Sequence, residues 1–375
     1  MERKLHNILV TGGAGFIGSN FIRYLFNMPA SCSFDDACFD GIVVNADCLT
    51  YAGNLENLYE VEEKFGGKRY FFERADICDS AAMERIFRQY DIDTVVHFAA
   101  ESHVDRSIVS PDSFMKTNVM GTFTLLEAAR RVWTMADGSV RGDVLFHHVS
   151  TDEVYGSLDD CGFFSEESVY DPHSPYSASK GAADHIVMSY FYTYGIPVTV
   201  SNCSNNYGPY QFPEKFIPHM ILELMDGCSL PVYGDGSNVR DWIYVEDHNR
   251  ALWLILHGGR AGCKYNIGGE NQWENIRLLH RLIGAVAQES GASPQWVSLA
   301  ESRIVFVKDR PGHDKRYAID CGRIKRELGW NRLMSFEEGL ELTVRWYINH
   351  SSWTGNILSG SYRDWIVENY ANRGV

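Results

Sequence analysis

Short apolar runs alternate with helix-like segments through the first half of the chain, and this alternation constrains the fold more than any other feature. The apolar runs are NILVT, GIVVNAD, TVVHFAA, DVLFHHVS and IPVTVSNC. Helical periodicity is expected in four places between them: from about Gly15, near SAAMERIFRQY, over 112–133 and from SPYSASK. In the last of these, Ser174 suits the N-cap and Pro175 the first helical position. Strands that alternate with helices form parallel sheets. The sequence therefore predicts an α/β fold with a Rossmann-like, doubly wound parallel sheet.

The length of 375 residues exceeds the size at which one core stays compact, so we expect two lobes. After Asn205 the regular alternation fades. The segment RDWIYVEDHNRALWLILHGG, from Arg240, has the pattern of one more strand and helix of the sheet domain. The predicted sheet domain spans 1–204 and 236–263, a smaller mixed α/β domain spans 205–235 and 264–350, and 351–375 is a C-terminal extension.

The chain is acidic, with a formal net charge of −15 from 34 basic and 49 acidic residues. Such a chain is repelled by nucleic acid and by anionic membranes, so neither is an expected partner. The first residues lack the long apolar run of a signal peptide, and no later segment reaches bilayer-spanning length. Nine cysteines without CxxC or metal-ligand spacing indicate reduced thiols of a cytoplasmic protein and no metal site. Cys32 and Cys38 are interpreted as part of a surface insertion at 27–40, with a ligand pair as the alternative.

A glycine-rich turn follows the first predicted strand. The segment VTGGAGFIGSN places Gly12, Gly15 and Gly18 between a strand and a helix. Glycines there allow a tight turn and bring backbone N–H groups close to a pyrophosphate at the helix N-terminus. The spacing is GxxGxxG rather than the commoner GxGxxG, but the strand-loop-helix context favours a dinucleotide site over a structural turn.

Two acidic residues follow the next strands. Asp47 ends GIVVNAD, where a carboxylate can accept hydrogen bonds from the ribose hydroxyls of an adenosine. Its charge would repel a 2′-phosphate, so NAD is expected rather than NADP. The alternative is a turn aspartate. Asp76, in RADIC after the third predicted strand, is a candidate for the adenine side of the same cofactor.

Three proton-capable residues, Thr151, Asp152 and Glu153, stand in a row after the run LFHHVS. Neighbouring residues of a strand point to opposite faces, so all three reach one ligand only if the chain bends as it leaves the sheet. We expect that bend and, with it, a site of proton transfer. The alternative is a solvated acidic loop.

Tyr176 and Lys180 in SPYSASK are four residues apart and share one face of the predicted helix. A nearby ammonium and a nicotinamide cation both favour the phenolate of a tyrosine, which could then accept a hydroxyl proton. Thr151 could hydrogen-bond the same hydroxyl. A lone YxxxK usually marks a solvated helix face, and its combination with the glycine turn and Thr151 makes the pattern specific.

These motifs resemble those of the extended short-chain dehydrogenase/reductase family and, within it, the nucleotide-sugar 4,6-dehydratases of the dTDP-glucose type. The resemblance covers almost the whole chain. It rests on TGGAGFIGSN, LTYAGNLENL, AAESHVDRSI, STDEVYG, SPYSASK, SNNYGPYQFPEKFIP, PVYGDGSNVRDWIYVEDH and DRPGHDKRYAID. Asp152 and Glu153 directly after Thr151 are the addition that is typical of the dehydratases.

The resemblance implies a hydro-lyase that dehydrates dTDP-glucose to dTDP-4-keto-6-deoxy-glucose, with tightly bound NAD⁺ that is regenerated in each turnover. Tyr176 would deprotonate the C4 hydroxyl as C4 is oxidised, and hydride would later return to C6. Glu153 would remove the C5 proton while Asp152 protonates the departing C6 hydroxyl. Asp152 must then stay protonated near neutral pH, which burial or the neighbouring Glu153 can achieve by raising its pKa.

The resemblance also implies which residues bind the ligands. Arg240 and Arg310 would hold the diphosphate, and Tyr233 with Pro231 and Val232 would line the base pocket. For each, a surface salt bridge or a core hydrogen bond is the alternative. The remaining implied cofactor contacts are Phe16, Ile17, Thr50, Ile77, Ala99, Ala100, Thr117 and Asn206, and the remaining implied substrate contacts are Ser102, Thr151, Asn205, Glu214, Lys215, Phe216, Asn275 and His313.

The sequence departs from the family pattern at few positions. These are the insertion at 27–40, His173 before SPYSASK, Gly181 after the lysine, and Phe216, where leucine is usual. Phe216 lies beside the expected sugar site and could alter sugar tolerance. The C-terminal segment SYRDWIVENY has no assigned role.

The helices at 112–133 and 175–194 resemble those that form a four-helix dimer interface in this family, so a homodimer is expected. The alternative is that their apolar stripes pack only on the sheet.

Rival functions remain at this stage. One is another NAD-dependent nucleotide-sugar enzyme, a 4-epimerase or a UDP-glucuronate decarboxylase, neither of which is expected to carry the Thr-Asp-Glu run. Another is a noncatalytic NAD-binding protein, which would usually have lost one of the catalytic groups. The sequence does not separate thymine from uracil in the base pocket, nor rhamnose from another deoxysugar as the destination of the product.

Overall fold

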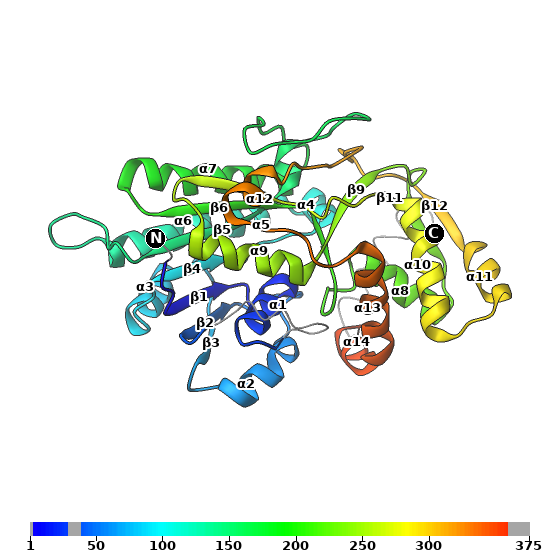
Figure 1. Ribbon diagram of the computed structural model, residues 1–375, viewed down its shortest axis with the longest axis horizontal. Coiled ribbons are helices and arrows are strands. Elements are labelled where there is room, and N and C mark those ends of the chain that lie inside the picture. The colour runs from blue at the N-terminus through cyan, green and yellow to red at the C-terminus, as the bar shows by residue number, and fades with distance from the viewer. Residues whose placement is uncertain (1–2, 29–38, 359–375) are drawn as a thin grey trace.

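A seven-stranded parallel sheet forms the centre of the structure, a computed structural model that describes residues 3–28 and 39–358. The strands are β1 (Asn7–Thr11), β2 (Ile42–Asp47), β3 (Tyr70–Arg74), β4 (Thr94–His97), β5 (Leu145–Thr151), β6 (Val198–Cys203) and β10 (Cys263–Ile267). Their order is β10-β6-β5-β4-β1-β2-β3, with every neighbouring pair parallel (Figure 1). The predicted doubly wound sheet is confirmed. The strand order reverses at β1, and ligands bind at the carboxyl ends of the strands beside such a reversal.

Helices cover both faces of this sheet (Figure 1). One face is covered by α1 (Phe16–Leu25), α9 (Val245–Gly258) and α12 (Gly322–Leu328). The other is covered by α3 (Ser80–Gln89), α6 (Thr122–Trp133) and α7 (Pro175–Tyr194). Buried apolar side chains from each layer, such as Phe21 of α1 and Leu126 of α6, pack against the strands. Each fully buried side chain of this kind stabilises the fold by roughly 1.5–3 kcal/mol relative to exposure, so the two layers hold the sheet rigid.

The strand that contains Arg240 is not part of the central sheet, so the prediction that it extends that sheet is wrong. It belongs to a small three-stranded sheet made of β7 (Asn205–Tyr207), β9 (Val239–Tyr244) and β11 (Gln272–Glu274). The seventh place in the central sheet is taken by β10, which pairs with β6. Trp242 and Tyr244 of β9 pack into the core of the second lobe, a long-range contact that the local pattern does not reveal. The predicted helix of this segment is present as α9.

The second lobe has an apolar core of its own and lies beside the central sheet (Figure 1). Its further elements are β8 (Leu230–Tyr233), β12 (Ile304–Val307), α8 (Phe216–Asp226), α10 (Asn275–Ser290), α11 (Pro294–Glu301), α13 (Phe336–Asn349) and α14 (Ser351–Leu358). Ile221, Leu282 and Val344 from three of these helices are buried together. The division of the chain into two domains and an extension stays a prediction. The strand pairing favours placing β9 in the second lobe, because it pairs with β7 and β11, and β10 in the sheet domain, because it pairs with β6.

Shorter helical segments connect these parts. They are α2 (Tyr59–Phe65), α4 (Val104–Val109), α5 (Pro111–Phe114), a π-helical segment at Met115–Gly121 and 3₁₀ turns at Leu55–Leu58 and Asp152–Tyr155. The predicted helix over 112–133 is therefore present as α5, the π-helical segment and α6 in succession. A π-helical segment inside a long helix changes the face that the following turns present.

No helix among the described residues is long and apolar enough to cross a membrane. The same part of the chain contains no cluster of three or more His, Cys, Asp or Glu residues able to hold a metal ion. Cys32, Cys38 and the segment SYRDWIVENY lie outside the described residues.

Helix α7 begins as predicted, with Ser174 as the N-cap and Pro175 at the first position. The Ser174 Oγ accepts the N–H of Ser177 at 3.0 Å, and the Ser177 Oγ accepts the N–H of Ser174 at 3.1 Å. This capping box satisfies two amide groups that the helix itself leaves unpaired. Gly195 ends the helix in the left-handed conformation, with a φ of 68°. The start of α7, which carries Tyr176, is thus held in one geometry.

Replacing Ser174 with alanine removes the side-chain acceptor of this cap. We expect the free energy of unfolding to fall by about 1 kcal/mol, which is typical for the loss of a serine N-cap. Urea denaturation followed by tryptophan fluorescence measures the change. Ser189→Ala is the matched control, because Ser189 is an exposed serine of the same helix that caps nothing. If both variants unfold at the midpoint of the parent protein, the cap does not stabilise the helix as inferred.

Candidate active site

The glycine turn after β1 has the geometry of a phosphate-binding loop. Gly12 has a φ of 70°, and a Cβ at this position would lie 2.7 Å from the backbone of Ala99. A Cβ on Gly18 would lie 2.4 Å from the carbonyl oxygen of Gly12. Only glycine fits these two positions without opening the turn. The N-cap of α1 is Gly15, which has no side chain to pair with the first N–H groups of the helix, so these groups remain for an anionic ligand.

Asp47 at the end of β2 supports this turn and also faces the cavity described below. Its carboxylate accepts the N–H of Ala14 at 3.0 Å and the N–H of Leu49 at 2.8 Å. Burial raises the pKa of Asp47, and these two N–H groups oppose that effect. Asp47 is thus a turn aspartate and a cavity residue at once. Asp76 lines the same cavity and accepts the N–H of Cys78 at 2.9 Å.

A cavity of about 490 Å³ runs along the carboxyl ends of the central strands. Every residue predicted to contact the cofactor lines it: Gly12, Gly15, Phe16, Ile17, Gly18, Asp47, Thr50, Asp76, Ile77, Ala99, Ala100, Thr117, Tyr176, Lys180 and Asn206. Ser113, Lys116, Cys203 and Gln211 line it as well. These four residues were not predicted, because they reach the cavity only through the packing of separate segments and no local pattern marks them.

The chain bends at the end of β5 as predicted. The strand ends at Thr151, and a 3₁₀ turn starts at Asp152. The Thr151 Oγ1 accepts the N–H of Glu153 at 3.3 Å and donates to the Asp152 Oδ1 at 3.4 Å. The bend allows all three residues to line the large cavity, which an extended strand could not do.

Asp152 and Glu153 are buried acids with different surroundings. Asp152 is 1% exposed, and its Oδ2 has no hydrogen-bond partner among the described residues. Burial raises the pKa of Asp152 well above its ordinary value, and the charge of Glu153 adds to the effect. Burial also raises the pKa of Glu153, but Arg310, Arg240 and Lys215 lower it. The arrangement therefore favours the protonated form of Asp152 more strongly than that of Glu153, whose charge is stabilised by three cations.

Tyr176 and Lys180 project from the first turns of α7, and both line the large cavity. Burial raises the pKa of Tyr176 well above its ordinary value, and Glu153 raises it further. The protein groups around Tyr176 therefore keep the phenol protonated, whereas the sequence analysis expected Lys180 to favour the phenolate. The Lys180 Nζ itself donates to the carbonyl oxygen of Val149, at 2.8 Å.

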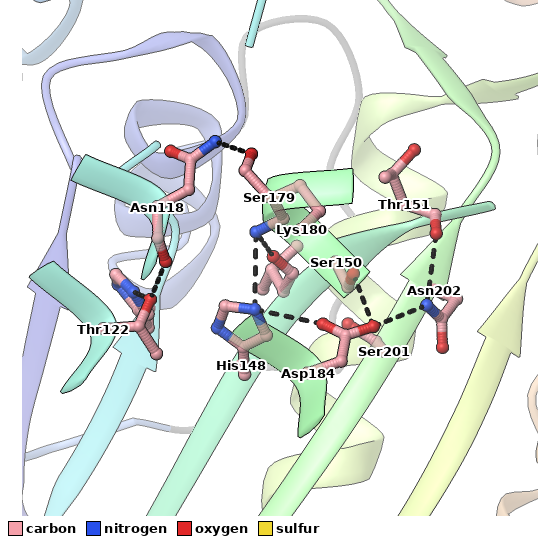
Figure 2. A network of polar contacts seen from close by, with 12 residues as sticks. Asn118, Thr122, His148, Ser150, Thr151, Ser179, Lys180, Asp184, Ser201 and Asn202 are labelled. Carbon is pink, nitrogen blue, oxygen red and sulfur yellow. Dashed lines mark hydrogen bonds and ion pairs between the residues drawn. The ribbon is translucent and has the colours of Figure 1, made fainter. Parts of the chain in front are cut away.

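A buried polar network lies behind Lys180 (Figure 2). The Lys180 Nζ is 3.4 Å from the His148 Nε2, which is 3.2 Å from the Asp184 Oδ1. Burial lowers the pKa of Lys180 to about 8, and the charge of Asp184 opposes this. Asp184 therefore favours the ammonium form of Lys180.

Asp184 is itself held by neutral donors. Its Oδ2 accepts hydrogen bonds from the hydroxyls of Tyr170, at 2.8 Å, and Ser150, at 2.9 Å, and from the amide of Asn202, at 3.3 Å. Burial opposes its ionisation, but the hydrogen bonds and the nearby cation lower its pKa. The sequence analysis missed this residue. Its position four residues after Lys180, on the same helix face, is the signal that could have found it.

A second cavity, of about 180 Å³, adjoins the first. Glu153, Asn205, Asn206 and the loop residue Gln211 line both cavities, which are therefore continuous. The predicted substrate residues that line the smaller cavity are Ser102, Asn205, Glu214, Lys215, Phe216, Tyr233, Arg240, Asn275, Arg310 and His313. His103, Asp105, His219 and Trp242 line it too and were not predicted.

Pro231 and Val232 do not line either cavity. Both lie in β8, and the side chain of Val232 is buried in the apolar core of the second lobe. The side chains of a strand alternate between its two faces, so Tyr233 faces the smaller cavity while Val232 faces the core. Val232 is thus a residue of the apolar core rather than of the base pocket.

Several polar atoms of the cavity walls have no hydrogen-bond partner within the described residues. They are the Arg310 Nε, the Asn205 Oδ1 and the Gln211 Oε1, together with the Asp152 Oδ2. Buried polar atoms are rarely left unpaired, so these atoms point to a polar ligand. Arg240 is different, because its guanidinium donates to the carbonyl oxygens of Val239 and Asp314.

Glu214 connects the two lobes at the site. Its side chain is 1% exposed and accepts hydrogen bonds from the Tyr51 hydroxyl, at 3.1 Å, and from the Arg106 Nε, at 3.3 Å. The Arg106 guanidinium stacks on the Tyr51 ring, 3.8 Å from its centre. The adjacent Lys215 donates to the carbonyl oxygen of Ser102 at 2.8 Å. These contacts hold Glu214 and Lys215 of the second lobe against the segments of the sheet domain that carry Tyr51, Ser102 and Arg106.

This chain is similar to known proteins in sequence and in fold. The profile of the GDP-mannose 4,6 dehydratase family matches residues 9–343. The dTDP-glucose 4,6-dehydratase of Salmonella typhimurium is 48% identical over 375 residues, which cover 98% of this chain and 99% of that protein. The chain belongs to the dTDP-glucose 4,6-dehydratase family. A solved member of this family, DesIV from Streptomyces venezuelae with NAD and TYD bound, is 44% identical with a TM-score of 0.81, covering 94% of this chain and 99% of that chain.

The same fold occurs in epimerases. The UDP-glucose 4-epimerase of Thermotoga maritima, solved with UDP-glucose, has a TM-score of 0.76 over 92% of this chain and 99% of that chain, at 29% identity. The similarity of this chain to the dTDP-glucose 4,6-dehydratase family is thus greater in sequence than its similarity to that epimerase.

Asp184→Asn tests the electrostatic role of the network behind Lys180. Lys180 is an ammonium below its pKa and loses the proton as pH rises through it; the charge of Asp184 raises this pKa. Removing the charge should therefore move the alkaline limb of the kcat–pH profile of the dehydratase reaction to lower pH. Each unit of displacement costs roughly tenfold in kcat on that limb. Initial rates between about pH 6 and pH 9 measure it.

The control is Ser150→Ala, which removes a donor to Asp184 and keeps its charge. It should leave the position of the alkaline limb unchanged. An unmoved limb in Asp184→Asn would show that Asp184 does not govern the charge of Lys180.

Proposed function

We propose that this chain is a hydro-lyase that dehydrates dTDP-glucose to dTDP-4-keto-6-deoxy-glucose with NAD⁺ as its cofactor. The single observation that carries the proposal is the bend that brings Thr151, Asp152 and Glu153 to the wall of the cavity lined by Tyr176 and Lys180. The shared family and the NAD and TYD in the related structure of DesIV support it. The adjacent acids are the groups that water elimination needs.

The residues of the large cavity fit a dinucleotide. The strained glycine turn and the uncapped start of α1 suit a pyrophosphate, and the carboxylate of Asp47 suits ribose hydroxyls. When bound there, NAD⁺ accepts hydride from C4 and returns it to C6, so net redox change is zero. A cofactor regenerated in place needs no exchange with solvent, which supports tight binding.

Tyr176 and Thr151 would act on the C4 hydroxyl of the sugar. Tyr176 would accept its proton, and Thr151 would hydrogen-bond the same hydroxyl. Burial keeps Tyr176 protonated when only protein groups surround it, so the phenolate requires the positive charge of Lys180 and of the nicotinamide ring. Of these two positive charges, the protein supplies that of Lys180, whose ammonium form is favoured by Asp184.

Asp152 and Glu153 would eliminate water across C5 and C6. Oxidation at C4 acidifies the C5 proton, which Glu153 would remove, while Asp152 would protonate the departing C6 oxygen. The raised pKa of Asp152 supports its role as the acid. Burial raises the pKa of Glu153, but the cations Arg310, Arg240 and Lys215 oppose that rise and support its role as the base.

The smaller cavity would hold the nucleotide diphosphate. Arg310 has an unpaired buried Nε, and the nearby Arg240 adds a second guanidinium, which suits the bidentate recognition of phosphate. Tyr233 would stack on or beside the base, and Asn205, Glu214, Lys215 and Asn275 would contact sugar or phosphate. Thymine as the base is supported by the dTDP-glucose relatives.

The proposal is tested by incubating the purified protein with dTDP-glucose or UDP-glucose without added NAD and following the product by mass spectrometry. We expect loss of water from the dTDP sugar, because the cofactor stays bound. Loss of water from neither sugar, even with NAD supplied, would contradict the proposal and favour another nucleotide sugar or a noncatalytic role.

Substitutions of the acid pair separate this reaction from epimerisation. In Asp152→Asn and Glu153→Gln we expect absorbance of reduced nicotinamide to appear with dTDP-glucose, while the formation of the dehydrated product falls about 10²–10⁴-fold, the usual range for losing an acid or base. Tyr176→Phe is the contrasting variant and should lose both signals. Normal dehydration by both acid variants would assign the chemistry to other residues.

We propose a homodimer and a cytoplasmic location. Apolar side chains are exposed on the neighbouring helices α6 and α7 and on the π-helical segment: Met115, Met120, Phe123, Tyr192 and Tyr194. Exposed apolar patches of this kind mark protein interfaces, which supports a four-helix contact between two copies. The free cysteines of the described residues support a reducing compartment.

Phe123→Glu tests the proposed interface. A carboxylate at this position of α6 would be buried without a partner between two copies, so we expect the mass measured by light scattering to fall from dimer to monomer. Leu299→Glu is the matched control, since Leu299 is an exposed apolar residue on α11 of the second lobe, and it should stay dimeric. A monomeric parent protein would contradict the dimer, and a dimeric Phe123→Glu variant would contradict this interface.

A further inference from the structure

His173 joins two segments of the active site that are far apart in the sequence. It directly precedes Ser174, the N-cap of α7, and its ring faces residues 309–315, which we call the diphosphate segment because it carries Arg310 and His313. The His173 Nδ1 lies 2.5 Å from the Asp314 Oδ1. The backbones are close as well, since a Cβ at Gly312 would lie 2.8 Å from the carbonyl oxygen of His173.

Both ring nitrogens of His173 face a carboxylate. The Nε2 lies 3.3 Å from the Asp171 Oδ2, and the Nδ1 bonds Asp314 as described. A neutral imidazole has one N–H and could donate to only one of these acids, whereas the imidazolium donates to both. The geometry around His173 therefore suits the charged ring.

Asp314 also contacts Arg240, the arginine that is proposed to bind the diphosphate. The Asp314 Oδ2 accepts the hydroxyl of Tyr317 at 2.5 Å, and the guanidinium of Arg240 lies over the Tyr317 ring, 4.2 Å from its centre. The carbonyl oxygen of Asp314 accepts the Arg240 Nη2 at 2.9 Å. Asp314 is thus held by His173 on one side and holds Arg240, directly and through Tyr317, on the other.

We propose that protonated His173 is a positioning residue that holds the diphosphate segment against the start of α7, and so sets the affinity for the nucleotide diphosphate. The inference rests on the proposed function, in which Arg240 and Arg310 hold that group. His173 lines neither cavity and acts through Asp314.

The charges around His173 favour its protonated form. The charged groups that face the ring are Asp171 from its own loop and Asp314 from the diphosphate segment. Lys315, the next cation along that segment, is paired with Asp160 at 2.6 Å. The hydrogen bond that the ring donates to Asp314 raises the pKa of His173. Since this pKa is raised on folding, the contact is complete below the ordinary value of about 6.5 and is lost as pH rises through the raised value.

The histidines that line the smaller cavity do not share this behaviour. Burial lowers the pKa of His313 to about 3 and that of His219 to about 4, and it lowers the pKa of His103 well below its ordinary value. All three stay neutral near pH 7. Lys180, whose pKa burial lowers to about 8, also titrates toward the upper end of the range. Only the part of the pH-dependent change in diphosphate affinity that His173→Gln abolishes is therefore assigned to His173.

The experiment measures binding of dTDP-glucose by calorimetry between about pH 6 and pH 8.5, in the Tyr176→Phe background so that no turnover occurs. The sugar diphosphate is a diester and does not titrate in this range. We expect Kd to rise about tenfold from the lower to the upper pH as the imidazolium contact is lost. In the same background, His173→Gln should bind with the weaker Kd at every pH.

His280→Gln is the matched control, because His280 is exposed to a similar degree and faces a single carboxylate, Glu301, at 3.1 Å. The Kd of this variant for dTDP-glucose should depend on pH as it does in the Tyr176→Phe parent. A pH-independent Kd in the parent, or an unchanged pH dependence in His173→Gln, would overturn the role of His173. Absence of dTDP-glucose binding at every pH would instead overturn the proposed function.

A second measurement uses the unaltered histidine. Because the coupling between two binding events is reciprocal, dTDP-glucose must raise the pKa of His173 if protonated His173 favours dTDP-glucose. An NMR titration of the ring with and without the ligand measures this. Equal pKa values in the two titrations would overturn the inference, whether or not the glutamine variant folds.

Discussion

The burial of ionisable groups at the carboxyl edge of the central sheet is the constraint on which the rest of the site depends. Taking a carboxylate out of water is costly unless a proton or a cation compensates it. Asp152 keeps its proton for this reason, while Arg310, Arg240 and Lys215 stabilise the charge of Glu153. One bend after β5 thus places two carboxyl groups side by side, and the difference between their pKa values comes from the cations Arg310, Arg240 and Lys215 that face Glu153.

The same constraint explains why buried partners stand behind the catalytic groups. Lys180 would lose its charge in a dry cavity, but Asp184 opposes that loss, and neutral donors in turn hold Asp184 (Figure 2). Arg240 is kept in place by carbonyl oxygens and by the ring of Tyr317. Lys180 and Arg240 are therefore each positioned by buried partners, and His173 extends the partners of Arg240 to the surface of the protein.

Local patterns predicted well what depends on neighbouring residues. The alternation of strands and helices, the glycine turn, the cap at Ser174 and the bend at Thr151 are present as expected, because backbone geometry and side-chain period determine them. The prediction failed for β9, whose pairing depends on contacts distant in sequence. Val232, named with Tyr233 for the base pocket, faces the core, because the orientation of a strand decides which of two neighbours reaches a cavity.

The sequence by itself determined the doubly wound sheet, the glycine turn and the candidate reactive side chains, since each depends on residues close together in the chain. Tertiary structure decided the rest. Only folding brings Glu153 near Arg310 and places Asp314 between His173 and Arg240. The protonation states of the site follow from burial and from charges on separate segments, and neither quantity exists until the two lobes pack together.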